Sequence, residues 1–149
     1  MWTLLIAAAL ADPSAAIAAR TGQPVAAVVA KGTWCQVCVA ELARLDPAAV
    51  ARSGGSVIGV FAETEGAVRA AGQGLPVPVV ADPDGAWVRD NGFTRPGLSH
   101  PLPGVLFYDR CGEPVARLDG RTPGRSQASV ILETLAQLAA APCEGRPQS

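Results

Sequence analysis

Two cysteines separated by two residues stand where a buried apolar run ends and a helical pattern begins. Residues 31–42 read KGTWCQVCVAEL and follow the apolar stretch 24–30. Beyond the cysteines, apolar residues at 39, 42 and 45 recur at helical spacing. Cys35 is therefore expected at a helix N-terminus, where free N–H groups and the helix dipole stabilise a thiolate and lower the pKa of the thiol.

Cys38 lies one helical turn beyond Cys35 and is expected on the same face of the helix. Its thiol is then close enough to attack a mixed disulfide formed at Cys35, so the spacing suits dithiol–disulfide exchange. A C-x-x-C pair is also half of many zinc sites, or a plain structural bridge. A zinc site needs two more ligands at suitable spacing. The remaining candidates, His100, Cys111 and Cys143, are far from this pair in the sequence and include no second closely spaced pair. No bound metal is therefore predicted.

Composition limits the chain to one domain of ordinary size. Its 149 residues can bury a real core, and 49% apolar against 17% charged residues argues against extended disorder. With a net charge of −1 and no basic block, nucleic acid and anionic membrane surfaces are not expected as partners. No apolar run reaches the roughly 20 residues that an integral membrane span needs.

Three parts are expected, an N-terminal extension, a main domain and a C-terminal tail, at residues 1–22, 23–141 and 142–149. The apolar run 2–10 ends in a small-x-small sequence typical of signal-peptidase sites, but no Lys or Arg precedes it. A cleaved signal, a truncated signal and a first strand packed on the domain all stay open. The sequence Asp-Pro-Ser at 12–14 predicts a short helix that ends near Gly22.

The main domain alternates strand and helix patterns. Continuous apolar runs predict buried strands, and N-cap residues followed by helical spacing predict helices. Strands are expected at residues 24–31, 56–61, 77–81, 104–108 and 114–118, the last two joined by a hairpin turn at 109–113. Besides the cysteine helix, helices are expected at about 47–53, 64–71, 87–91 and 126–140.

The sequence WCQVCVAEL at 34–42 is the specific part of a wider pattern, which adds Gly32, Asp82, Pro83, Gly85, Pro103, Phe107, Asp109 and Gly112. With the order of elements, this pattern resembles the thioredoxin-fold superfamily over about residues 20–140. Within it, the chain is most similar to the branch shared by thioredoxin-like periplasmic reductases and the alkyl-hydroperoxide-reductase/thiol-specific-antioxidant (redoxin) proteins. The resemblance implies an α/β three-layer fold with a central mixed β-sheet flanked by helices.

The resemblance also implies a division of roles. Cys35 would be the attacking cysteine and Cys38 the resolving one, in exchange with protein dithiols and disulfides and without a cofactor. Glu41 would take the proton from Cys38, although a solvated residue on a helix face is the alternative. Ordinary thioredoxins bury an acidic residue where this chain has Val29. Glu41 is therefore the nearby carboxylate that could accept the proton of Cys38. Trp34 should pack beside the dithiol and contact substrate.

Pro103 stands where this fold places a cis-proline that faces the dithiol. A cis bond there would let the backbone of Leu102 pair with an extended substrate chain, so Leu102 and Pro103 are predicted substrate contacts. An ordinary proline that begins a strand is the alternative.

Two other functions stay open. A peroxiredoxin-like thiol peroxidase would need Pro-x-x-x-Thr-x-x-Cys, yet counting back from Cys35 gives Gly32 and Val28 at the Thr and Pro positions. A non-catalytic copper chaperone of the same fold would combine thiolates with an imidazole, and His100 is expected in the loop facing the dithiol.

The implied fold places the hairpin with Cys111 and the end of the last helix at the pole opposite the dithiol. A structural disulfide between Cys111 and Cys143 is therefore predicted, with two unpaired buried cysteines as the alternative. Such a bridge persists in an oxidising compartment, which favours a periplasmic or otherwise exported protein over a cytoplasmic one.

Overall fold

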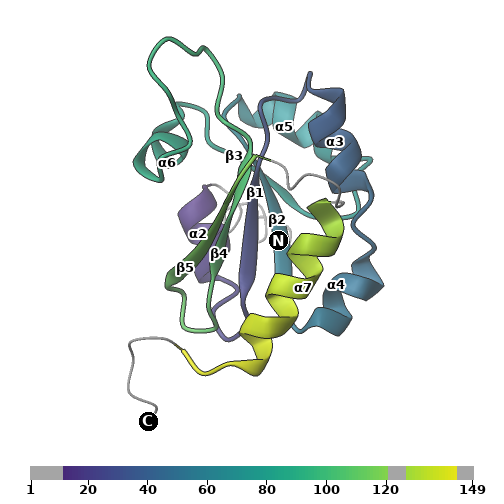
Figure 1. The fold of residues 1–149 in the computed structure, drawn as a ribbon. Coiled ribbons are helices and arrows are strands. Elements are labelled where there is room, and N and C mark those ends of the chain that lie inside the picture. Colours follow the sequence, from purple (N-terminus) through teal and green to yellow (C-terminus); the bar gives the residue numbers. More distant parts are fainter. Residues whose placement is uncertain (1–11, 121–126, 144–149) are drawn as a thin grey trace, which may run out of the picture.

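The computed structural model describes residues 12–120 and 127–143, which form a twisted sheet between two layers of helices (Figure 1). Five strands make one mixed sheet in the order β3-β2-β1-β4-β5. Their bounds are Val25–Val29 (β1), Ser56–Phe61 (β2), Val79–Ala81 (β3), Gly104–Tyr108 (β4) and Pro114–Asp119 (β5). The first three strands are parallel to one another, whereas β4 is antiparallel to β1 and β5 to β4.

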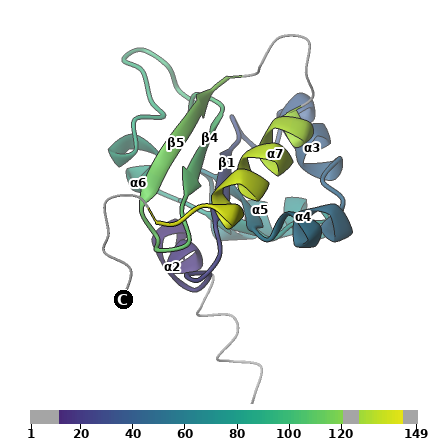
Figure 2. The ribbon, with the colours of Figure 1, turned by 60° about the horizontal axis from the view of Figure 1, so that its bottom comes forward.

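Helices cover both faces of the sheet. Their bounds are Pro13–Ala18 (α2), Gln36–Ala43 (α3), Pro47–Ser53 (α4), Glu65–Gly72 (α5), Ala86–Asp90 (α6) and Gln127–Ala140 (α7). Helices α2 and α6 pack on one face, and α3, α4, α5 and α7 pack on the other (Figures 1 and 2). The predicted three-layer α/β architecture is therefore confirmed.

The central strand β1 is apolar throughout because both of its faces are buried. Ala26 and Val28 belong to the core on the α3 and α7 side. Val25, Ala27 and Val29 belong to the core on the α2 and α6 side. β1 is paired along its whole length with β2 on one edge and β4 on the other, so the loop that follows it is held in place.

The strands begin and end within two residues of the predicted positions. β1 ends two residues early, at Val29, and β3 starts two residues late, at Val79 rather than at 77. Pro78 has no N–H to give to the ladder, and only its carbonyl accepts, from the Gly59 N–H at 2.9 Å. The predicted N-terminal helix ends early, at Ala18. The possible signal sequence lies outside the described residues, and within them no helix is long and apolar enough to cross a bilayer.

Several residues of the sequence pattern beyond the cysteines serve the fold. Asp82 is buried, and its carboxylate accepts the backbone N–H groups of Trp87 at 3.3 Å and Val88 at 2.9 Å. It thereby satisfies the free donors at the start of α6. Gly85 takes a left-handed conformation, with φ of +70°, in the turn that leads into that helix.

Tyr108, the only tyrosine of the chain, is 8% exposed at the end of β4. Burial raises its pKa from 10.0 to about 12. Because folding favours the neutral phenol, this contribution to stability is complete below pH 10 and is lost as the pH rises from 10 to 12. An ultraviolet titration should give a midpoint near 12 for the folded protein and near 10 in denaturant. Equal midpoints in both states would contradict the burial.

Candidate active site

Cys35 and Cys38 form a disulfide at the amino end of α3, with their Cα atoms 5.3 Å apart. Cys35 is the N-cap residue of the helix, in an extended conformation with φ −82° and ψ 98°. Its sulfur accepts the backbone N–H of Cys38 at 3.3 Å. The same N–H is available to stabilise negative charge on this sulfur when the pair is reduced.

The two cysteines have different surroundings. Cys38 packs against the hydrophobic core between α3 and the sheet. Cys35 follows Trp34, whose side chain is 63% exposed, and the neighbouring Val37 is 54% exposed. Both cysteines are half-buried, so they differ in their neighbours rather than in their own exposure. The roles of attacking and resolving cysteine stay a prediction.

A pocket of about 220 Å³ opens beside the disulfide. The end of β1, the first turns of α3, Pro103 and the buried Gln127 of α7 form its walls. Cys35, Cys38 and Glu41 all line it. The structure thus brings four predicted site residues together, and it adds Gln127, which sequence reasoning missed because α7 reaches the site only through the fold.

Glu41 is 4% exposed, so the alternative of a solvated residue on a helix face is wrong. It is buried because α3 turns this face toward the sheet, where the next residue, Leu42, enters the core. Its Oε1 lies 3.4 Å from Nη1 of Arg44, an ion pair at long range. Glu41 shares the pocket with Cys38, and its role as proton acceptor stays a prediction.

The predicted cis-proline is wrong, because the described residues contain no cis peptide bond and Leu102–Pro103 is trans. Backbone hydrogen bonds hold both sides of Pro103. The Leu102 N–H donates to the Phe93 carbonyl at 2.8 Å, and the Pro103 carbonyl accepts from Gly120 at 3.0 Å. A trans X-Pro bond is favoured by roughly 0.5–1 kcal/mol unless tertiary contacts impose cis. Pro103 still lines the pocket, while Leu102 is not among its walls.

A second carboxylate, that of Glu63, contacts the loop between β1 and α3, here called the cysteine loop. Its two oxygens accept the backbone N–H and the hydroxyl of Thr33, the hydroxyl at 2.8 Å. Sequence reasoning missed this contact, which joins residues 30 positions apart. A signal existed, since Glu63 follows β2 just as the cysteine loop follows β1, and the carboxyl ends of parallel strands meet at one edge. Glu63 therefore fixes the backbone immediately before Trp34 and Cys35.

Replacing Glu63 with alanine is expected to lower the free energy of unfolding by about 1–3 kcal/mol, because two donors of Thr33 lose a charged acceptor. Glu63→Gln keeps one acceptor and should cost less. Urea denaturation measures both variants against Asp90→Ala, an exposed control expected to stay within about 0.5 kcal/mol of the native chain. An Ala variant as stable as this control would show that the hydrogen bonds between Thr33 and Glu63 do not stabilise the loop.

Trp34 lies over Gly32 and reaches the loop that carries His100. A Cβ at position 32 would overlap the indole, which explains the glycine. The Trp34 and His100 rings meet edge to face, with centroids 5.9 Å apart. His100 Nδ1 lies 2.9 Å from the Pro101 carbonyl. Among the described residues, the imidazole does not join the two cysteines in a group of three metal-binding donors, so the copper site of the alternative function is not formed here.

Arg117 of β5 anchors the start of this loop. Its guanidinium donates to the carbonyls of Asn91 and Gly92 and lies 4.0 Å from the centroid of the Phe93 ring. Its Nε donates to Asp119 at 2.7 Å. The loop that places His100 and Pro103 near the disulfide is therefore fixed to the sheet at its origin.

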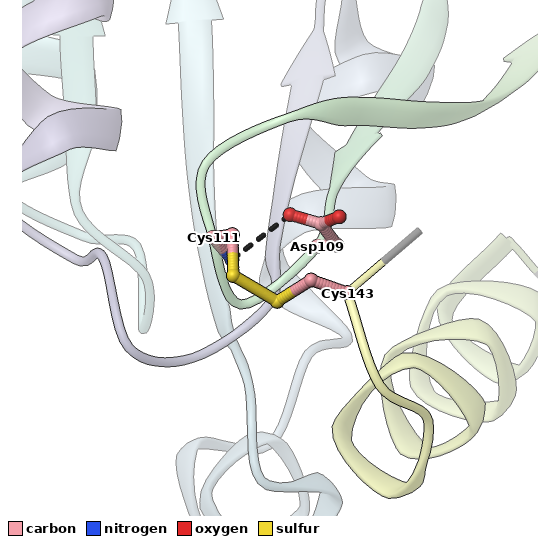
Figure 3. A group of neighbouring side chains, drawn as sticks. All are labelled: Asp109, Cys111 and Cys143. Atoms are coloured by element: carbon pink, nitrogen blue, oxygen red, sulfur yellow. Dashed lines mark hydrogen bonds between the residues drawn. A yellow bond between two sulfur atoms is a disulfide. The ribbon is translucent and has the colours of Figure 1, made fainter. Parts of the chain in front are cut away.

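Cys111 and Cys143 form a second disulfide, the pairing that the sequence predicts, with Cα atoms 6.0 Å apart. Cys111 lies in the turn between β4 and β5, and Cys143 follows α7 (Figure 3). Because β4 runs antiparallel to β1, this turn is at the end of the sheet opposite the first disulfide. The second bridge joins the hairpin to the C-terminal helix, far from the pocket.

No family model and no curated protein matches the chain. Solved structures do match it. Peroxiredoxin Q of Xanthomonas campestris shares 16% identity at a TM-score of 0.70, over 80% of this chain and 81% of that one. AhpC of Enterococcus faecalis shares 15% at 0.67, over 78% and 74%. A putative thiol:disulfide interchange protein DsbE of Chlorobium tepidum shares 21% at 0.62, over 80% and 84%.

The likeness spans both kinds of protein named by the sequence resemblance, peroxiredoxins and a thiol:disulfide interchange protein. At sequence identities this low, the likeness shows that the backbones are arranged in the same way. The chain therefore has a thioredoxin-like fold.

Proposed function

We propose that the protein is a thiol–disulfide oxidoreductase that uses Cys35 and Cys38 to exchange disulfides with partner proteins. The observation that carries this proposal is the asymmetric disulfide at the start of α3. One sulfur caps the helix and accepts a backbone N–H, and the other packs against the core. This arrangement provides a stabilised thiolate on the accessible side and a protected thiol within reach of it.

In the reducing direction, the Cys35 thiolate attacks one sulfur of a partner's disulfide, and the partner's other sulfur leaves as a thiolate. Cys38 then loses its proton, with Glu41 in the shared pocket as the acceptor, and attacks the Cys35 sulfur. The Cys35–Cys38 disulfide forms, and the partner's second thiolate is released. Two electrons pass to the partner, and the reverse sequence oxidises it.

The surface around the dithiol suits a protein partner. Two exposed apolar side chains, Trp34 and Val37, lie within two residues of Cys35 in the sequence. Single exposed apolar residues are ordinary on protein surfaces, but these two adjoin a reactive group. An exported location in an oxidising compartment remains part of the proposal, since both disulfides would persist there.

The alternative of a thiol peroxidase finds no support at the positions that its motif requires. Gly32 occupies the place of the peroxide-binding threonine and is covered by Trp34. The neighbouring hydroxyl, that of Thr33, donates to Glu63.

Replacing Cys38 with alanine tests the proposal, because the mixed disulfide at Cys35 would then lack its resolving thiol. The reduced variant, mixed with a disulfide-bonded model protein, should accumulate a covalent adduct that dithiothreitol releases. Non-reducing electrophoresis and mass spectrometry locate the adduct. The matched control is Cys35→Ala, which leaves Cys38 packed against the core and should trap little. Equal trapping by both variants, or by neither, would contradict the mechanism.

A further inference from the structure

Three donor atoms meet at the pole opposite the dithiol. One carboxylate oxygen of Asp109 and the sulfurs of Cys111 and Cys143 all lie within 4.8 Å of one another. Figure 3 shows Asp109 beside the disulfide, where the hairpin turn meets the segment after α7. Both cysteines are partly exposed, while Asp109 is buried. The group belongs to no part of the proposed exchange mechanism.

The Asp109 carboxylate is held in a fixed orientation. Its Oδ1 accepts the N–H of Cys111 at 2.9 Å and the N–H of Glu113 at 3.0 Å. These two bonds close the turn at Gly112, whose φ is +84°. One oxygen therefore suffices to stabilise the hairpin.

The burial of the other carboxylate oxygen, Oδ2, is not explained by the hairpin. Asp109 is 3% exposed, and its Oδ2 is buried without a hydrogen-bond partner in the described structure. Burying a carboxylate oxygen without a partner is costly, so such an oxygen calls for a donor or a cation. The Cys111–Cys143 disulfide, which neighbours the carboxylate, can supply neither, because a disulfide sulfur has no proton to donate.

We propose that reduction of the Cys111–Cys143 disulfide converts this cluster into a binding site for one divalent metal ion of the zinc type. A dithiol reductant transfers two electrons and two protons to the disulfide, giving two thiols, and is itself oxidised to a disulfide. The metal ion then displaces the two thiol protons and binds both thiolates and the Asp109 carboxylate. A water molecule completes four-coordination.

The donor set determines the class of metal. Two thiolates and one carboxylate favour Zn²⁺ over Mg²⁺ or Ca²⁺, which prefer oxygen ligands alone. The Cys111 N–H bond to Oδ1 acts as an outer contact that orients the carboxylate. The same contact between hairpin and C-terminal helix would thus be made by a disulfide under oxidising conditions and by a metal ion under reducing conditions.

The test uses the full chain with Cys35→Ser and Cys38→Ser, which removes the other dithiol and leaves the proposed exchange activity out of the measurement. After reduction and removal of the reductant, Co²⁺ and Zn²⁺ are titrated. The expected result is one Co²⁺ per chain, with thiolate-to-cobalt charge-transfer absorption that Zn²⁺ abolishes. The oxidised protein should show none.

Asp109→Asn in this background should weaken Zn²⁺ binding at least about tenfold, whereas the exposed control Asp90→Asn should not change it. A further Cys143→Ser change should abolish the site. If reduction unfolds the chain, thermal melting still tests the proposal, because Zn²⁺ should then restore folding. Zn²⁺ should raise the Tm of the reduced protein and leave the Tm of the oxidised protein unchanged. Absence of 1:1 binding, binding unaffected by Asp109→Asn, or no effect of Zn²⁺ on the reduced protein's Tm would each overturn the proposal.

Discussion

Replacing Cys35 with serine is expected to abolish disulfide exchange, with a loss of at least about 10³-fold in rate. A serine hydroxyl at the helix N-cap still caps α3, but it is not a nucleophile toward disulfides at neutral pH. The fold should persist because the side chain is nearly the same size. The measurement is the reduction of a disulfide-bonded model protein by dithiothreitol, with and without the purified variant.

A serine introduced elsewhere on the same helix controls for this change. Ala40→Ser lies on an exposed position of α3 and should leave the rate unchanged. Circular dichroism of both variants shows whether the helix and the sheet persist. Exchange activity retained by the Cys35→Ser variant would mean that the disulfide at the start of α3 is not the reactive group.

Removing the Cys111–Cys143 disulfide is expected to lower the free energy of unfolding by about 3–4 kcal/mol. The bridge spans 32 residues, and the chain-entropy estimate grows with the length of the closed loop. Replacing both cysteines by serine, followed by urea denaturation, measures the loss. A decrease of this size is a large part of the 5–15 kcal/mol typical of a domain, so the Tm should fall as well.

The other disulfide is the internal control for this prediction. Cys35 and Cys38 are separated by only three positions, so the same estimate gives about 2 kcal/mol or less for that pair. The double serine variants should therefore differ clearly in their denaturation midpoints. Equal losses, or no loss on removing Cys111 and Cys143, would contradict a structural role for the second bridge.

Local sequence patterns were sufficient to predict most of the fold. The run at 24–30 is apolar because β1 is buried on both faces, and a strand of that kind needs no long-range information to be recognised. The cysteine motif, by its place between this strand and α3, located the site. The Cys111–Cys143 pairing followed once the topology was assumed, because antiparallel β4 carries its turn away from the dithiol.

The features that sequence reasoning missed depend on contacts between distant elements. The Leu102–Pro103 bond is trans beside hydrogen bonds to Phe93 and Gly120, neither of which a local pattern reveals. Glu63 acts on Thr33 across two neighbouring strands. The burial of Glu41 depends on which face α3 presents to the sheet. Such details follow from packing, so a single sequence gives at most a reason to look for them.

A redox titration of the purified protein against glutathione buffers tests the central claim most directly. Thiol alkylation followed by peptide mass spectrometry reports each disulfide separately, and tryptophan fluorescence, to which Trp34 contributes, gives an independent signal. A single two-electron transition at Cys35 and Cys38 is predicted, with Cys111–Cys143 still oxidised. A midpoint below about −250 mV would indicate a reductant, and one above about −150 mV an oxidant or isomerase. If Cys35 and Cys38 show no transition, the protein is not a thiol–disulfide oxidoreductase.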